Sequence, residues 1–430
     1  MDYFFGYLLS GLAIAVSSYQ LAKGRIAVAP VLLVAMELLV ATLSGENIIY
    51  SEFALIWSHR GAFFSGTQNV AYFSAILGLY MVVYFYSYWG VKMKPLTEGF
   101  AAFMRRVKPN NITIGSVLVF LFTLAHISVL DFHKVMSTST YSLMGSIGAL
   151  SVVSPFTIFV QLAFKFVGLI AFVLFAAAIS SRNKLATAIL AMPCAWFLVF
   201  EIAEHSRYSV VYLGIGGGVL LFSRRRVASA VFFLAMAASY VNALFGRASG
   251  ANGLSHVGDI VKYLDQFRFT DLLEFFTNMF EGAYVQGEVF IWRGPMPVDI
   301  YRILSFSPLP SFIDGFRTYA APHTPRFETF VPMGATGEVY LFGWPYFALY
   351  YFVVAWAYLA VNSLFARRSF GLFVACFAIF SLATYLQFAY PVRLVFRFYL
   401  LVVVLASSGK RWRRIRATVF GPFLRPRSEK

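Results

Sequence analysis

The sequence predicts an all-α polytopic membrane protein, and three observations lead to this fold class. Only 13% of the 430 residues are charged, whereas 60% are apolar and 19% are aromatic; an average soluble domain has about a quarter of its residues charged. The mean hydropathy is +0.72. The apolar residues gather in stretches close to the length of about 20 that a bilayer-spanning helix needs. The two cysteines lie within such stretches, so a disulfide scaffold is excluded.

Eleven stretches are apolar and long enough to be spans, the seventh being short enough to be tilted or partly buried in protein. The first begins Met-Asp with no basic residue ahead of it and is followed by Lys23 and Arg25, which predicts a retained anchor rather than a cleaved signal peptide. The stretches are residues 3–22, 26–44, 70–90, 112–130, 156–179, 185–202, 209–222, 227–245, 345–365, 371–390 and 392–407.

The formal charge of +16 is explained by the loops between these spans. Cytoplasmic loops of membrane proteins collect Lys and Arg. Here every second loop and the C-terminal tail are basic, and together they hold 22 of the 35 basic residues but only Glu98 and Glu429 among the acids. This alternation predicts about 11 spans, with the N-terminus outside, in the periplasm, and the C-terminus in the cytoplasm. The charge is therefore a topology signal, and no nucleic-acid partner is expected.

Most of the outside mass is predicted to lie in one loop, residues 246–344. Its first part, residues 257–280, repeats apolar side chains near helical spacing and predicts amphipathic helix. Its second half is rich in Pro, Gly and aromatic residues and predicts a packed irregular loop on the membrane surface. The expected organisation is spans one to eight (1–245), this periplasmic loop (246–344), spans nine to eleven (345–407) and a basic cytoplasmic tail (408–430).

The large loop carries six arginines and one lysine, Lys262, against ten acidic residues. A guanidinium binds phosphate or carboxylate through two parallel hydrogen bonds. We expect about half of the arginines to pair with the acids and a membrane-facing subset to suit a pyrophosphate. No Asp-x-Asp or histidine cluster with metal-ligand spacing occurs, so neither a metal nor a cofactor is expected. The arginines are Arg247, Arg268, Arg293, Arg302, Arg317 and Arg326.

The first candidate site stretch joins the sixth and seventh spans by a very short turn. Glu201, Glu204, His205 and Arg207 crowd this turn, and ionisable residues at membrane depth are costly and usually functional. Gly218 follows Arg207 by eleven residues, close to three helical turns, so both share one face with the glycine about 16 Å deeper. A cation above a glycine track predicts a groove for a lipid phosphate. In the alternative, the glycines only allow close helix packing and Arg207 only pairs with Glu204.

The second candidate stretch, residues 332–344, leads directly into the ninth span. Three glycines alternate with Glu338 and Tyr340, which puts a carboxylate at the membrane interface on a backbone that a ligand can approach closely. An interfacial aromatic belt with a capping glutamate would explain Tyr340 and Trp344 but not Glu338.

The third candidate stretch begins the last span. Arg393 and Arg397 lie one turn apart, so both can face one cavity, with Arg397 further in. Snorkelling would account for Arg393 but poorly for Arg397.

Three single residues complete the candidates. Lys165 lies near the middle of the fifth span and Glu37 near the middle of the second, and the two are expected to pair, either structurally or as a proton pathway in a transporter. His323 is a candidate base in the large loop, where a histidine is more often only a surface residue.

Together, the dominant outside loop, the Arg207-x10-Gly218 spacing and the Gly337-Glu338-x-Tyr340-x-x-Gly343 segment before a span resemble the Wzy-type O-antigen (oligosaccharide repeat-unit) polymerases, which are GT-C-like membrane glycosyltransferases. In that family an arginine-x10-glycine pattern recurs in outside loops. For the second copy in the large loop, Arg302 and Arg317 are chosen because they flank the proline-rich residues 305–315, although residue 313, eleven after Arg302, is isoleucine.

The resemblance implies a polymerase at the periplasmic face of the inner membrane of a Gram-negative bacterium. The growing glycan on undecaprenyl pyrophosphate would be the donor, and one repeat unit on the same carrier the acceptor, whose sugar hydroxyl attacks the anomeric carbon while undecaprenyl pyrophosphate leaves. Such a reaction needs a base, cations for the leaving group and grooves for two lipids. The residues expected to supply them are Glu338, Glu204 or His323 as base or sugar ligand, Arg207, Arg393, Arg397, Arg302 and Arg317 as cations, and Gly218 and Tyr340 as further contacts.

Three alternatives stay open. An O-antigen ligase-like enzyme would use the same donor with another acceptor. A flippase or secondary transporter would predict inverted repeats and broken helices, and the sequence shows no repeat, but Lys165 and Glu37 keep this class in play. A structural scaffold fits least well with the ionisable cluster. The sequence also leaves open which sugars are joined and whether a chain-length regulator binds.

Overall fold

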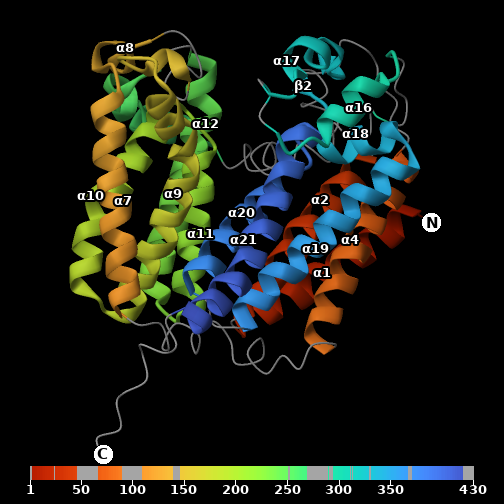
Figure 1. Ribbon diagram of the computed structural model, residues 1–430, viewed down its shortest axis with the longest axis horizontal. Coiled ribbons are helices and arrows are strands. Elements are labelled where there is room, and N and C mark those ends of the chain that lie inside the picture. The colour runs from red at the N-terminus through yellow and green to blue at the C-terminus, as the bar shows by residue number, and fades with distance from the viewer. Residues whose placement is uncertain are drawn as a thin grey trace, which may run out of the picture. The chain divides into compact units, whose positions relative to one another are not determined.

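The computed structural model describes residues 2–23, 25–45, 66–89, 109–138, 146–249, 252–268, 289, 294–309, 311, 313–328, 331–366 and 370–419. These residues are almost entirely helical (Figure 1). Among them, one two-stranded antiparallel ribbon interrupts the helices, with Arg326 opposite Pro332 and Glu328 opposite Val331. The chain divides into two compact units, which are described separately.

The first unit comprises residues 1–20, 27–97 and 280–430. Its long helices are rich in buried aromatic and small apolar side chains, and a group of short elements precedes α18 in the chain. The long helices are α1 (Asp2–Ala22), α2 (Ala29–Gly45), α4 (Gly66–Trp89), α19 (Trp344–Ala366), α20 (Phe370–Leu386) and α21 (Val392–Val419). The short elements are α16 (Asp299–Ser305), α17 (Phe316–Tyr319), the 3-10 turn Ala321–His323, β1 (Arg326–Glu328), β2 (Val331–Pro332) and α18 (Ala335–Phe342).

The second unit comprises residues 21–26 and 98–279. It is a helical bundle in which α9 packs against α7, α10 and α11, and α11 packs against α12. Its helices are α7 (Pro109–Val129), α8 (Phe132–Met136), α9 (Pro155–Ser181), α10 (Lys184–Ala203), α11 (Tyr208–Phe222), α12 (Arg226–Ser249) and α13 (Ile260–Gln266). Three 3-10 turns complete the described chain, Ile26–Val28, Ile147–Ala149 and Leu254–Asp259.

The helix ends in the second unit follow from local sequence signals. Ser154 caps α9 by accepting from the Thr157 N–H, the Thr157 hydroxyl accepts from the Ser154 N–H, and proline occupies the first helical position. Arg182 ends α9 in a left-handed conformation, and Asn183 caps α10 directly afterwards. A short sequence of capping residues therefore produces the tight connection between two long apolar helices.

Eight of the described helices are long and apolar enough to cross a membrane, and two shorter apolar helices, Tyr208–Leu221 and Ala375–Leu386, overlap the seventh and tenth predicted spans. The eleventh predicted span forms the first part of α21. The prediction of an all-α membrane-embedded protein is confirmed. The number of crossings and the orientation remain predictions. The amphipathic stretch predicted at residues 257–280 is described only to residue 268 and is helical to Gln266.

A buried polar network holds the long helices of the first unit together around Gln387, at the end of α20. The Gln387 side chain donates to the Tyr80 hydroxyl at 3.2 Å and accepts from Tyr399 at 3.2 Å and Tyr350 at 3.4 Å. The main-chain carbonyl oxygen of Gln387 accepts a hydrogen bond of 3.1 Å from the N–H of Thr336, which lies in the first turn of α18. All these residues are fully buried or nearly so. Buried polar groups need hydrogen-bond partners, and through these partners Gln387 connects the end of α20 to α4, α18, α19 and α21.

We expect Gln387→Met to lower the stability of the first unit by about 1–3 kcal/mol, because methionine fills a similar volume but removes the hydrogen bonds to three buried tyrosine hydroxyls, of which Tyr80 and Tyr399 also bond each other. Thermal unfolding in detergent micelles would measure the change. Gln387→Glu, which keeps the two acceptor contacts, is the matched control and should be less damaging. A melting temperature for Gln387→Met equal to that of the unchanged protein would contradict the role of this network.

Candidate functional site

The Glu338 carboxyl is fully buried near the N-terminal end of α21. One carboxyl oxygen accepts a hydrogen bond from the Tyr301 hydroxyl of α16 at 2.7 Å, and the other accepts from the Val392 N–H, the first of α21, at 2.7 Å. Helix N-termini favour such acceptors because their first N–H groups have no partner within the helix. Glu338 thus joins α18, α16 and α21, and in this arrangement its carboxyl is closed to any ligand.

Burial also decides the ionisation of this carboxyl. It raises the pKa of Glu338 to about 8, and the hydrogen bonds from Tyr301 and Val392 only partly oppose the shift. Burial, followed by the adjacent Glu338 charge, raises the pKa of the Tyr301 phenol, which therefore stays protonated and remains the donor. Gly334 lets α18 begin here, because a side chain at this position would collide with the Phe388 carbonyl.

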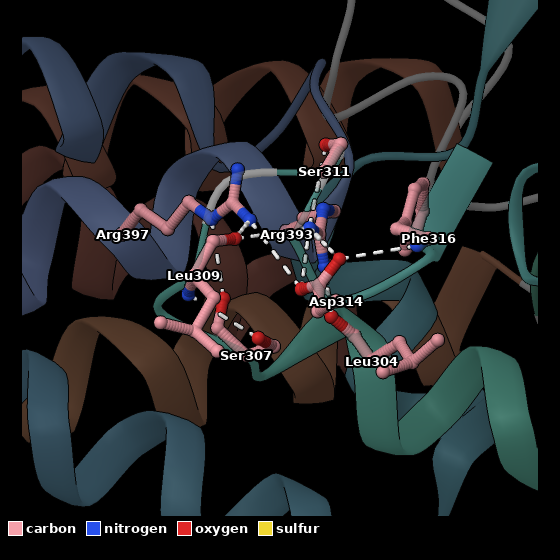
Figure 2. A network of polar contacts seen from close by, with 8 residues as sticks. All are labelled: Leu304, Ser307, Leu309, Ser311, Asp314, Phe316, Arg393 and Arg397. Atoms are coloured by element: carbon pink, nitrogen blue, oxygen red, sulfur yellow. Dashed lines mark hydrogen bonds and ion pairs between the residues drawn. The ribbon is translucent and has the colours of Figure 1, made fainter.

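Arg393 forms a buried ion pair with Asp314, shown in Figure 2. The Arg393 Nη2 atom lies 2.7 and 2.9 Å from the two carboxylate oxygens, and the side chains are 7% and 5% exposed. The same guanidinium donates to the carbonyls of Leu304 and Leu309, and it stacks over the Phe316 ring at 3.9 Å. Burial opposes ionisation of Asp314, but hydrogen bonds from Ser307 and Arg393 bring its pKa down to about 2. Arg393 is thus committed to holding the loop.

Arg397 lies one turn further along α21 and is 27% exposed. Its Nε atom donates to the Ser307 carbonyl at 3.1 Å, and its Nη2 donates to the Leu309 carbonyl (Figure 2). The distance to Asp314 is 3.9 Å, so the two arginines share one acid. This leaves a net positive charge at the cluster, and Arg397 is its more exposed cation.

The remaining candidates of the first unit lie at the surface in varying degrees. Arg302 is 24% exposed and forms an ion pair with Asp299 at 3.4 Å. Arg317, on α17, and His323 are exposed. Tyr340 is 45% exposed and packs edge-on against Tyr72, with ring centroids 5.7 Å apart.

The second unit has its own ionisable cluster at the turn between α10 and α11. Lys165 forms an ion pair with Glu204 at 3.6 Å, and its ammonium lies 4.4 Å from the centre of the Tyr208 ring. Glu201 is fully buried and accepts from the Tyr212 hydroxyl at 3.2 Å. The pairing of Lys165 with Glu37, which belongs to the first unit, remains a prediction.

Arg207 and Gly218 lie at opposite ends of a helix that is packed for much of its length. Arg207 precedes the first residue of α11 and is partly exposed, and Gly218 is also partly exposed. Gly216 and Gly217 lie against the rings of α12, because added side chains there would meet Phe232 and Phe233. Close helix packing therefore explains Gly216 and Gly217. Less of the glycine run on α11 is then left to line the predicted lipid groove.

Several residues of these clusters were not found by sequence reasoning. Tyr301 and Asp314 carry no local signal, since each is defined by a partner far away in the chain. Two other loop arginines were overlooked: Gly258 follows Arg247 and Gly337 follows Arg326 by eleven residues, so the arginine-x10-glycine spacing does recur in the large loop. The side chains of Arg247 and Arg326, like all of Arg293, lie outside the described part of the chain.

Of the three candidate stretches, the Glu338 segment and the Arg393–Arg397 pair meet in the first unit, together with the α16 segment of the large loop. Comparison with protein-family models, with curated proteins and with solved structures finds no match to the chain. A functional conclusion must therefore come from the chemistry of the two clusters.

Glu338 predicts a pH-dependent stability. Because the folded pKa of about 8 exceeds the ordinary value of 4.5, the folded state holds the proton more tightly, and its stability falls as the pH rises between these values. We expect a loss on the order of 4 kcal/mol between pH 5 and pH 8, at 1.36 kcal/mol per unit. Unfolding in detergent as a function of pH would measure it.

Glu338→Gln is the control for this prediction, because it keeps a hydrogen-bonding side chain of the same shape without a titrating proton. The variant should lose most of the pH slope between pH 5 and pH 8. An unchanged slope would assign the effect to another group.

The two arginines of α21 should differ in their effect on stability. Arg393→Met leaves the buried Asp314 charge without its main partner, and breaking a buried pair costs about 3–5 kcal/mol. Arg397→Met removes a more exposed cation and should cost clearly less. Chemical unfolding of both variants compares them, and equal losses would show that Arg393 is not the principal partner of Asp314.

Proposed function

We propose that this membrane protein is a glycosyltransferase that polymerises lipid-pyrophosphate-linked oligosaccharide repeat units, as the resemblance to Wzy-type polymerases implies. The observation that carries the proposal is the meeting of the Glu338 segment, the α16 segment and the arginine pair at the N-terminal end of α21. This arrangement supplies a partly exposed cation at the end of an apolar helix, the position where a lipid-linked pyrophosphate would meet the protein.

In the proposed reaction, Arg397 is the residue that binds the leaving pyrophosphate. Departure of undecaprenyl pyrophosphate leaves negative charge on phosphate oxygens, and a preplaced guanidinium stabilises that charge. Arg397 is 27% exposed, whereas Arg393 is 7% exposed and paired with Asp314. Arg393 and Asp314 then act by holding Arg397 and the loop in position.

The proton of the attacking sugar hydroxyl needs an acceptor within hydrogen-bond reach. Glu338 is buried with both oxygens bonded, and Glu204 is paired with Lys165. His323 is exposed. Access to substrate therefore favours His323 among the three candidate bases, while Glu338 serves the site as the connection between α16 and α21.

The recurrence of the arginine-x10-glycine spacing adds weight to this family. Arg326-x10-Gly337 ends one residue before Glu338, and Arg207-x10-Gly218 spans α11. In the proposed enzyme these two arginines serve the two lipid-linked substrates, donor and acceptor.

A transporter is the second candidate, and one observation favours it. Lys165, Glu204 and the fully buried Glu201 form a charged cluster among helices long and apolar enough to span a membrane. Such clusters mark proton or ion pathways in transporters.

The proposal can be tested in cells that normally make the polymer, after their own copy of this gene has been replaced by a variant. We expect Arg207→Ala, Arg326→Ala or Arg397→Gln to give glycan with a single repeat unit at unchanged protein level, because each removes a cation required for chain growth. Glycan length on a gel is the measurement. Lys262→Gln removes an exposed loop cation and is the matched control, which should keep long chains.

Other outcomes separate the alternatives. Long chains in every arginine variant would overturn the polymerase assignment of these residues. Loss of even single-unit glycan in cells without the protein would indicate a ligase or a flippase. A transporter would instead lose function on Lys165→Met while tolerating Arg326→Ala.

A further inference from the structure

An apolar surface lies on the part of the large loop that packs against α21. Five large side chains there are 43–60% exposed, although they belong to no predicted span. On α16, Tyr301 and Ser305 face the protein while Ile300 and Ile303 face away from it. A soluble surface rarely exposes so many apolar side chains together unless they bind something. The five are Met296, Ile300, Ile303, Leu309 and Ile313.

The hydrogen bonds to the main chain of this segment are a second observation. Arg393 donates to the carbonyl of Leu304, both arginines donate to that of Leu309, and Arg397 donates to that of Ser307. In water such carbonyls need no protein partner. In hydrocarbon they do, and irregular backbone is tolerated at membrane depth only where it is buried in protein or lines a water-filled cavity. The two guanidinium groups cover the carbonyls of Leu304, Ser307 and Leu309, so this part of the main chain is turned toward protein.

The depth of the segment follows from α21. Its apolar stretch, residues 392–407, measures about 24 Å at 1.5 Å per residue, less than the roughly 30 Å hydrocarbon core. If α21 crosses the bilayer, as its sequence predicts, its first turns are needed to reach across the hydrocarbon, and both arginines lie within them. The loop carbonyls bonded to these arginines then lie within the reach of an arginine side chain from that level.

Exposed apolar side chains also occur on the two predicted spans α19 and α21. On α19, Trp344 is 76% and Phe352 64% exposed, and on α21, Leu394 is 38% exposed. Leu394 directly follows Arg393, whose side chain is bonded to the loop. Exposed apolar side chains therefore occur both on the predicted spans and on the loop that is bonded to α21.

We propose that α16 and the described residues that follow it, up to Ile313, insert into the bilayer leaflet at the N-terminal end of α21, with Ile300, Ile303, Leu309 and Ile313 in contact with lipid acyl chains. The occupant of this surface is the bilayer itself. Asp299, whose side chain is 86% exposed, and Arg302, paired with it at 3.4 Å, mark the edge of the inserted part, where charges remain in the headgroup region. The inference does not rest on the proposed enzymatic function.

Site-directed spin labelling of the full chain, in nanodiscs of phosphatidylethanolamine and phosphatidylglycerol, tests the proposal. Single cysteines replace Ile300, Ile303 or Asp299, with the two buried native cysteines changed to alanine. Oxygen concentrates in hydrocarbon and a neutral nickel chelate in water, so relaxation by the two reagents reports the surroundings. Phe352→Cys, on a span, is the lipid-facing control.

We expect the ratio of oxygen to nickel accessibility at positions 300 and 303 to match that at 352 and to exceed that at 299 several-fold. A ratio at 303 equal to that at 299 would place the segment in water and overturn the proposal. Protection of 300 and 303 from both reagents would do the same, because it would mean that a protein, such as a second copy of the chain, covers the surface. Loss of folding in one cysteine variant leaves the other position to decide.

Discussion

The architecture around α21 depends on the contacts of the Arg393 side chain. One guanidinium neutralises a buried carboxylate, stacks on an aromatic ring and satisfies two main-chain carbonyls. A lysine could not do this, because its ammonium has neither the planar face nor the fork of donors. The pair with Asp314 gives little net stability by itself, since desolvation offsets attraction. Its value lies in fixing an irregular loop against one turn of one helix.

Glu338 shows how a residue that suggests catalysis can serve architecture. A carboxyl between glycines at a membrane interface suggests an accessible acid or base, yet each oxygen already accepts a hydrogen bond that joins two elements. Any ligand that reached this carboxyl would have to displace Tyr301 and so loosen α16. The raised pKa has the same origin as the structural role, because complete burial produces both.

The apolar windows predicted the helices well because a span is encoded locally, by about 20 consecutive residues. Pairings were harder to predict. Lys165 forms an ion pair with Glu204, which the sequence did not predict, because depth in the membrane alone does not identify neighbouring helices. Asp314 and Arg393 are 79 residues apart. Either could have been assigned to many partners, since composition and spacing contain no information on which loop returns to which helix.

If the loop inserts into the bilayer and the protein is the proposed enzyme, one consequence follows for Arg397. Arg397 lies beside Leu309, whose carbonyl it binds and whose side chain is 48% exposed. If that side chain is in hydrocarbon, the guanidinium lies at the boundary between acyl chains and headgroups. A polyprenyl pyrophosphate presents the same sequence of groups, an apolar chain ending in charged phosphate oxygens. The loop carbonyls hold the Arg397 guanidinium in place before substrate arrives, so little reorganisation is needed when phosphate binds. One arginine therefore satisfies the backbone of the loop and remains exposed enough to bind the lipid-linked substrate.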